Sequence, residues 1–291
     1  MKKLFAWAGL VTASVACQPQ AAQTPVAPEV AASTTQPASP AKTAPPAIAD
    51  SLTPQMRTML RQVDLANLFR DNSPVLDGFF GNNPQRLSLA LVKVTRDSLK
   101  PGLFHIVGKS RYKKQVAAFT GSIQLTSVAD YYDQGRLLSQ GEDTFIQDTT
   151  AGGTGDILNA RAYSAAGVFS FTSKAPVTYA LSGRALLDFW ITDKGKIGGL
   201  YSPCEGCVEE EAPTKGSGLL MRGSWLDTNT KSRRPFLVCR DVFFISNNLI
   251  ADFAIGDRGA QVNPKYDKQG WRDYWENDEW WADAPKPSLS L

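Results

Sequence analysis

The alternation of hydrophobic and polar residues predicts β-strands through most of the chain after residue 74. In residues 167–173, two phenylalanines alternate with Ser170 and Thr172, and residues 185–192 repeat the pattern with Asp188 on the polar side. Such alternation is typical of an antiparallel sheet with one buried face and one face in water. The predicted strands cover residues 87–95, 104–110, 116–125, 167–173, 185–192, 196–201, 218–225, 236–239, 242–245 and 249–255.

These runs predict a mainly β fold, either an antiparallel barrel or a two-sheet sandwich. No strand–helix–strand rhythm occurs in the sequence, which argues against a parallel nucleotide-binding sheet. One helix should precede the strands, because Thr53 can cap it, Pro54 suits its first turn, and apolar residues recur at helical spacing up to an expected end near residues 69–72. Residues 126–165 carry no clear pattern and are expected to form a long loop or irregular edge strands.

The first 17 residues have the pattern of an export signal. Lys2 and Lys3 precede about 12 apolar or small residues, fewer than the roughly 20 that a membrane-spanning helix needs. The segment ends in Ser14-Val15-Ala16-Cys17 and resembles the signal of bacterial lipoproteins. That resemblance implies a diacylglycerol on the Cys17 thiol and cleavage just before this residue. Ser14 stands where a leucine-like residue is usual, so simple secretion after cleavage by ordinary signal peptidase stays open.

Residues 18–50 have the composition of a disordered tether. Ala, Pro, Thr, Ser and Gln dominate, seven prolines occur, and there is no aromatic residue. Such a segment cannot bury enough apolar surface to offset the entropy lost on ordering, and its prolines favour extended stretches. We therefore predict a signal peptide at 1–16, a lipidated Cys17 with a tether up to residue 50, and a single β-rich domain at 51–291.

The charge of the chain gives no general reason to expect nucleic acid as a partner. The formal net charge is +3, and loss of the two lysines of the signal leaves about +1. Two short basic runs stand out, RYKK at 111–114 and KSRR at 231–234. Each is interpreted as the solvated tip of a hairpin rather than a phosphate-binding stripe.

Three short patterns link the domain to known proteins: Gly108-Lys109-Ser110-Arg111-Tyr112, Phe119-Thr120-Gly121 and Gly223-Ser224-Trp225. Turns of this kind occur in the β-rich domains of exported bacterial lipoproteins, which the chain resembles. The resemblance implies an exported β-rich domain, but it implies no activity, catalytic residue or cofactor.

Groups with catalytic or metal-binding chemistry are sparse. His105 is the only histidine and lies within an apolar strand, and Ser110 lacks a nucleophile-elbow motif, so we expect a hydrogen-bonded or surface-facing histidine. Cys204 and Cys207 form a CEGC motif, for which a loop disulfide is the leading interpretation, with inert thiols, a metal knuckle or a redox pair as alternatives. Cys239 is then a buried thiol. No catalytic residue, metal ligand or cofactor is assigned.

The C-terminal segment 270–281 is the candidate binding surface. It holds four of the seven tryptophans within eleven residues, and on a helix Trp271, Tyr274 and Trp275 would share one face. That face can dock on the β domain and close it, or, together with Trp281, bind sugar rings or a protein partner. A glycosidase-like pair of carboxylates is a further alternative.

Together these features favour a non-enzymatic binding or interaction module held at a bacterial envelope. Its expected partners are membrane lipid, through the acylated Cys17, and an envelope protein, a glycan or a small apolar ligand. The alternative is an envelope hydrolase whose site is assembled from separated carboxylates and hydroxyls. Gln18 is not the aspartate that retains some lipoproteins at the inner membrane, so the outer membrane is the preferred location, with a secreted or periplasmic protein as the second possibility.

Overall fold

The computed structural model divides the chain into two units, Met1–Pro46 and Ala47–Leu291. The described residues are 52–71, 73–81, 85–134, 160–173, 178–202, 209–246, 254–255, 261–275 and 279–283. The predicted signal peptide, Cys17 and the tether lie outside the described residues, as do Cys204 and Cys207.

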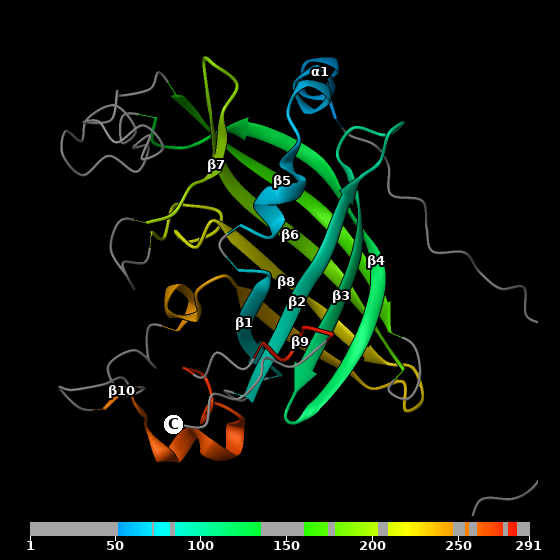
Figure 1. Cartoon of the computed structure of the whole chain (residues 1–291), viewed down its shortest axis with the longest axis vertical. Helices are drawn as coiled ribbons and strands as arrows, with labels where there is room; N and C mark the ends of the chain where they lie inside the picture. Colours follow the sequence, from blue (N-terminus) through cyan, green and yellow to red (C-terminus); the bar gives the residue numbers. More distant parts are fainter. Residues whose placement is uncertain are drawn as a thin grey trace, which may run out of the picture. The chain divides into compact units, whose positions relative to one another are not determined.

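One large antiparallel sheet dominates the second unit and closes on itself (Figure 1). The main strands are β1 (Val75–Phe80), β2 (Gln85–Arg96), β3 (Leu103–Tyr112), β4 (Gln115–Asp130), β5 (Ala160–Ser173), β6 (Tyr179–Thr192), β7 (Ile197–Gly199), β8 (Leu219–Asp227) and β9 (Arg233–Cys239). The ring runs β1-β2-β3-β4-β5-β6-β8-β9, and β9 pairs back onto β1 with Asp77 opposite Cys239. Of the two predicted alternatives, the fold is therefore the barrel.

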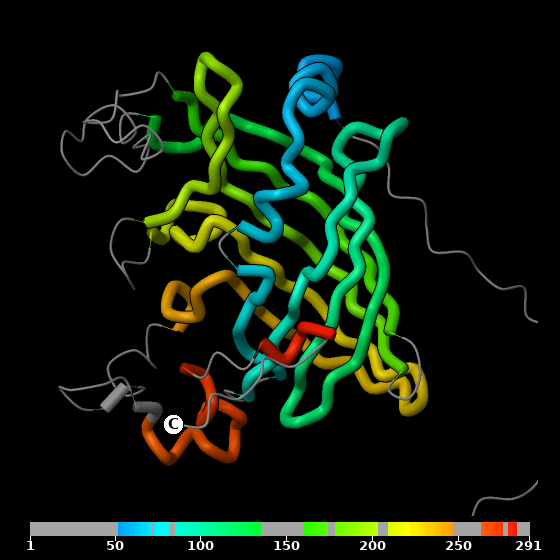
Figure 2. The backbone as a smooth tube through the Cα atoms, viewed as in Figure 1, coloured from blue at the N-terminus to red at the C-terminus, as the bar shows by residue number. Residues whose placement is uncertain are grey.

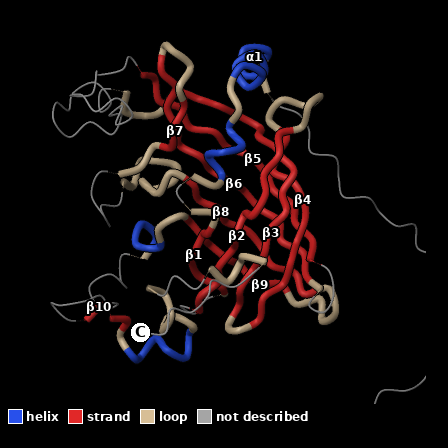
Figure 3. The backbone as a smooth tube through the Cα atoms, viewed as in Figure 1, coloured by secondary structure: helices blue, strands red, loops and turns tan. Residues whose placement is uncertain are grey.

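Short pieces of structure complete the ring. Strand β7 pairs with β6 beyond the point where β8 stops pairing with it. A separate two-stranded ladder joins β10 (Ala254–Ile255) to β11 (Gln261–Val262). The helical segments are α1 (Pro54–Gln62) and the 3₁₀ turns η1 (Leu65–Phe69), η3 (Val242–Ile245) and η4 (Pro264–Gln269), which Figure 3 separates from the strands by colour. None of the described helices has the length and apolarity needed to cross a membrane.

The N-terminal helix forms as predicted but ends earlier. The Thr53 hydroxyl accepts the backbone N–H of Met56 at 3.3 Å, and Pro54 occupies the first turn. The helix stops at Gln62 rather than near residues 69–72. The reason is local, because the Asp64 carboxylate accepts the N–H of Ala66 at 3.0 Å and starts the separate 3₁₀ turn η1.

Apolar side chains fill the interior of the closed sheet. Phe119 of β4 stacks on Phe171 of β5 with ring centroids 4.9 Å apart, while Thr172 beside it is exposed, as the alternation predicts. The turn η1 packs into this core, with the ring of Phe69 5.0 Å from that of Phe104. Burial of apolar side chains on this scale is the main stabilising contribution to the fold.

Some predicted strands have different bounds or a different structure. Strands β4, β5 and β6 are longer than predicted, because small and polar residues at their ends still pair across the ring. Residues 242–245 form the 3₁₀ turn η3 and not a strand, since the Asp241 carboxylate accepts the N–H of Phe243 at 2.9 Å. Of the predicted strand 249–255, only the last two residues are described.

The glycines in two of the short sequence patterns have a packing role. A Cβ placed on Gly121 would lie 2.0 Å from the carbonyl oxygen of Ser170, and a Cβ on Gly223 would lie 2.2 Å from that of Ser182. Neighbouring strands approach too closely at these points for any side chain. The patterns therefore reflect how this sheet bends and closes.

Candidate functional site

The two ends of the closed sheet are built differently (Figure 2). At one end lies α1, and Leu52 and Leu60 pack against Gly102 in the turn between β2 and β3. The opposite end carries the turns β1–β2, β3–β4 and β8–β9. The first described residue, Leu52, is thus at the α1 end.

A cavity of about 510 Å³ opens at this second end. Its lining residues come from four strands and the turns that follow them. We call this set the basic mouth, and its residues are Phe80, Gly81, Gln85, Tyr112, Lys113, Arg233, Arg234 and Pro235. The volume is within the range of ordinary small-molecule sites.

Aromatic rings form the floor of the basic mouth. Phe80 of β1 lies 4.6 Å from Tyr112 of β3 and 5.3 Å from Trp225 of β8, measured between ring centroids. The Tyr112 hydroxyl donates to the side-chain carbonyl of Gln85 at 2.5 Å. These side chains face the interior of the sheet near the ends of their strands. The floor of the cavity is therefore the outermost layer of the hydrophobic core at this end.

Deeper in the core, below this floor, lies one more polar pair. Tyr179 stacks on Trp225 at 3.8 Å, and its hydroxyl is 2.6 Å from that of Ser110. Burial raises the pKa of Tyr179 to about 12, so its phenol stays neutral. This hydrogen bond gives each of the two buried hydroxyls a partner. Neither of them therefore needs a ligand to complete its hydrogen bonding.

Three cations line the same cavity. The guanidinium of Arg234 lies 5.6 Å from the centroid of Phe80, and the ammonium of Lys113 lies 5.5 Å from that of Tyr112. Arg233 is exposed beside them, and no Asp or Glu is among the described residues that line the cavity. The two predicted hairpin tips, RYKK and KSRR, thus converge on one site, which their separation in the sequence did not indicate.

The predicted Trp-rich surface lies elsewhere, on the outer face of β1, β2 and β3. It is irregular and not helical, because Gly270 with φ of 87° ends η4 just before Trp271. Trp271 is fully buried 5.7 Å from Phe79, whereas Trp275 keeps 42% of its surface exposed. Tyr274 and Trp281 are half-buried. The residues therefore do not form the single face that a helix would give them. We call residues 270–275 and 279–283 the C-terminal clasp.

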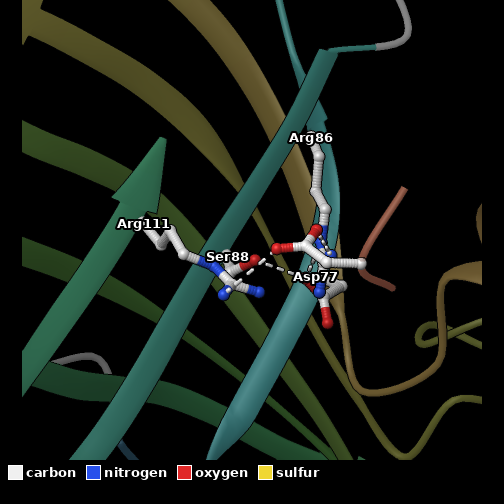
Figure 4. Close-up of polar contacts among 5 residues, drawn as sticks. Asp77, Arg86, Ser88 and Arg111 are labelled. Atoms are coloured by element: carbon white, nitrogen blue, oxygen red, sulfur yellow. Dashed lines mark hydrogen bonds and ion pairs between the residues drawn. The ribbon is translucent and has the colours of Figure 1, made fainter. Parts of the chain in front are cut away.

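A buried ion pair lies beneath the clasp (Figure 4). The Asp77 carboxylate accepts from Arg86 Nε at 2.9 Å and from the Ser88 hydroxyl at 2.5 Å. Asp273 of the clasp reaches Arg86 at 3.1 Å and Arg111 at 3.6 Å. Burial by itself lowers the pKa of Arg86, but the two carboxylates outweigh it and the pKa is raised. This network of hydrogen bonds and ion pairs attaches the clasp to the sheet.

The guanidinium of Arg86 also lies between two rings of the clasp. It is 5.6 Å from the centroid of Trp271 and 5.1 Å from that of Tyr274. Arg111 lies 5.0 Å from Trp280, and Lys109 donates to Asp283 at 2.9 Å. Because these side chains hold one another, the clasp uses its aromatic residues mainly to dock on the sheet.

The structure separates the two groups that a hydrolase triad would need. His105 is exposed on the outer face of β3 and lies 2.9 Å from the Asp97 carboxylate, while Ser110 is buried on the inner face of the same strand. Cys239 is a free buried thiol that donates to the carbonyl of Asp241 at 2.8 Å, and burial raises its pKa. No group of three metal-ligating side chains occurs within the described part of the chain.

One buried carboxylate departs from the sequence-based expectation. The alternation in β6 places Asp188 on the solvent face, yet only 1% of its surface is exposed. The connection after β7 covers it, and Thr214 donates its N–H at 3.1 Å and its hydroxyl at 2.6 Å to Asp188, with Ser164 donating at 2.7 Å. Burial raises its pKa. Thr214 belongs to the connection and Ser164 to the neighbouring strand β5, so Asp188 ties the connection to the sheet and we interpret it as structural.

Comparison with models of protein families, with curated proteins and with solved structures finds no match to this chain. What the structure defines by itself is a class: a closed antiparallel sheet with a filled core, a basic cavity at one end and a docked C-terminal clasp. Any functional assignment therefore depends on the site and not on similarity to known proteins.

Proposed function

We propose that the chain is an exported, lipid-anchored protein of a bacterial envelope, and that its β domain binds a small ligand at the basic mouth without chemical turnover. The observation that carries the binding role is the cavity of about 510 Å³ with an aromatic floor and three cations at its rim. A largely preformed, concave site with a few polar groups is the usual form of a ligand site.

The position of the cavity fits an anchored protein. Acyl chains on Cys17 would attach the N-terminus to the membrane, at about 0.8 kcal/mol per buried methylene. The chain enters the β domain at the α1 end, and the basic mouth is at the other end of the sheet. Among the described residues, the segment that follows the predicted tether therefore lies at the opposite end of the sheet from the mouth. The outer membrane is the proposed location.

Binding is favoured over hydrolysis by the groups around the cavity. A carboxylate-based hydrolase needs two carboxyl groups facing the substrate, and the described lining contains none. The buried Asp188 lies on the outer face of β6 under the connection 209–218. The hydrolase alternative thus has no support at the basic mouth.

The anchor is tested by detergent phase partitioning. The parent chain is expected in the detergent phase, and the Cys17→Ala chain in the aqueous phase. If both chains partition alike, the lipid-anchor part of the proposal is wrong.

The site is tested by identifying what the protein carries. The full chain is purified from envelope fractions, and co-purifying small molecules are measured by mass spectrometry. We expect a bound molecule that is lost from Arg234→Gln but retained by Trp275→Ala, which alters an exposed residue of the clasp. If Arg234→Gln and the parent carry the same amount of the bound molecule, the ligand site is not at the basic mouth. Loss only from Trp275→Ala would assign binding to the clasp instead.

A further inference from the structure

We infer that the basic mouth takes an amphiphilic anion, that is, a phosphate or carboxylate head attached to a flat or apolar body. This inference rests on the proposed binding function and adds the chemical class of the ligand. It follows from the charge of the rim and the composition of the floor.

The rim offers positive charge that the protein itself does not neutralise. Among the described residues, no carboxylate forms an ion pair with Lys113, Arg233 or Arg234. Asp227, in the adjacent β8–β9 turn, accepts the backbone N–H groups of Asn229 and Thr230 at 2.8 and 3.0 Å. These backbone bonds chiefly lower its pKa, to which Arg234 adds a small share. A guanidinium presents a planar fork of donors that matches phosphate and carboxylate oxygens.

The buried arginines of the sheet show the contrast. Arg86 and Arg111 both meet the carboxylate of Asp273. In both, a guanidinium that packs against an aromatic ring of the clasp is also paired with an anion. Arg234 lies over the Phe80 ring but is exposed, and no carboxylate is among the described residues that line the mouth beside it. A ligand with a negatively charged group would supply a partner for this guanidinium.

The floor selects for a body attached to the head. Tyr112 is half-buried and presents ring surface beside the cations, whereas Phe80, which is 5% exposed, and Trp225 support it mainly from the core. An inorganic anion would leave this surface uncovered. A flat or apolar group would cover it, with a gain of about 25 cal/mol for each Å² removed from water.

The turn that carries Lys113 offers a matched control for a test. Lys113 has φ of 56°, a left-handed conformation that glycine adopts readily and lysine does not. Lys231, at the neighbouring β8–β9 turn, has φ of 58° but does not line the cavity. Changing either lysine to glycine relieves the same strain and removes the same charge. Only Lys113 is in place to touch a ligand, so the two form a matched pair for a test.

The test is calorimetric titration of the full chain carrying Cys17→Ala with phenyl phosphate, phenol and inorganic phosphate. Phenyl phosphate should bind at least about tenfold more tightly than either of the other two. Lys113→Gly and Arg234→Gln should each weaken phenyl phosphate binding by about tenfold, the loss expected for one charge-assisted hydrogen bond, while Lys231→Gly should leave it unchanged. Binding should also weaken as salt is raised.

Several results would overturn the inference, and they are separable from failure of the proposed function. Phenol binding as tightly as phenyl phosphate, with the same loss in Arg234→Gln, would keep the binding site but remove the anion. An equal loss in Lys231→Gly would show a general charge effect and no site. If none of the three probes binds, the ligand class is wrong, and the co-purified molecule then decides the proposed function independently.

The anionic head has two possible sources, a soluble amphiphile or a lipid headgroup. Flotation of the same protein with phosphatidylglycerol vesicles separates them. Lys113-dependent flotation, with Lys231→Gly as the control, would identify the lipid headgroup. Absence of flotation together with binding of phenyl phosphate would identify a soluble ligand, and either outcome supports the inferred chemistry.

Discussion

Replacement of Arg86 by leucine should destabilise the protein more than any change at the surface of the clasp. Arg86 is 7% exposed and its partner Asp77 is 13% exposed, so the pair is largely removed from water. The substitution leaves the Asp77 carboxylate buried, with the Ser88 hydroxyl as its remaining side-chain hydrogen-bond donor among the described residues. Loss of one member of a buried pair costs about 3–5 kcal/mol, because the other charge stays desolvated without compensation.

The size of the effect can be bracketed from the structure. Leucine keeps part of the apolar contact with Trp271 and Tyr274, so the cation–π contribution, about 1–2 kcal/mol, is only partly additional. We therefore expect a loss of about 3–5 kcal/mol in the free energy of unfolding of Arg86→Leu. Asp273→Asn is the control, since Asp273 is 42% exposed and should contribute about 1 kcal/mol or less.

The assay is urea unfolding of the full chain carrying Cys17→Ala, followed by tryptophan fluorescence and circular dichroism. The double change Asp77→Asn with Arg86→Leu should recover part of the loss, because it removes the stranded charge. A loss below about 1 kcal/mol for Arg86→Leu would refute the argument. So would an effect of Asp273→Asn as large as that of Arg86→Leu, because the pair would then not be the buried determinant.

Two further predictions concern the clasp and the acid range. Trp271→Ala should cost about 3–5 kcal/mol of unfolding free energy, because a fully buried indole is replaced by a cavity, whereas Trp275→Ala should cost well under half as much; equal costs would contradict the assigned burial. The hydrogen bond with His105, together with backbone N–H groups, lowers the pKa of Asp97 to about 2 from 3.8. A carboxyl group whose pKa is lower in the folded state stabilises that state at pH values above its pKa in the unfolded chain, and this stabilisation is lost as the pH falls. Between about pH 4 and pH 2 the parent should therefore lose stability more steeply than Asp97→Asn. Urea unfolding at a series of fixed pH values would measure this difference. Parallel pH profiles would exclude this contribution.

The candidate site shows how far local patterns reach. The runs RYKK and KSRR were correctly placed at hairpin turns, since β3–β4 and β8–β9 turn there. That the two turns share one cavity depends on pairing of β1 with β9, which joins residues about 160 positions apart. The prediction that Asp188 faces solvent was wrong for a related reason. The connection 209–218, more than 20 residues further along the chain, folds over it.

The sequence by itself determined the local features of this protein. Thr53 and Pro54 start α1, and alternating residues give most of the strands, each decided by neighbours within a few residues. Strand β1, Val75–Phe80, was not predicted. The tertiary structure alone decided that the sheet closes and that Trp271 is buried rather than presented. The physical reason is that a barrel and a sandwich require the same alternation of buried and exposed positions. They differ only in which distant edges pair, and that choice is made by long-range packing of the whole core.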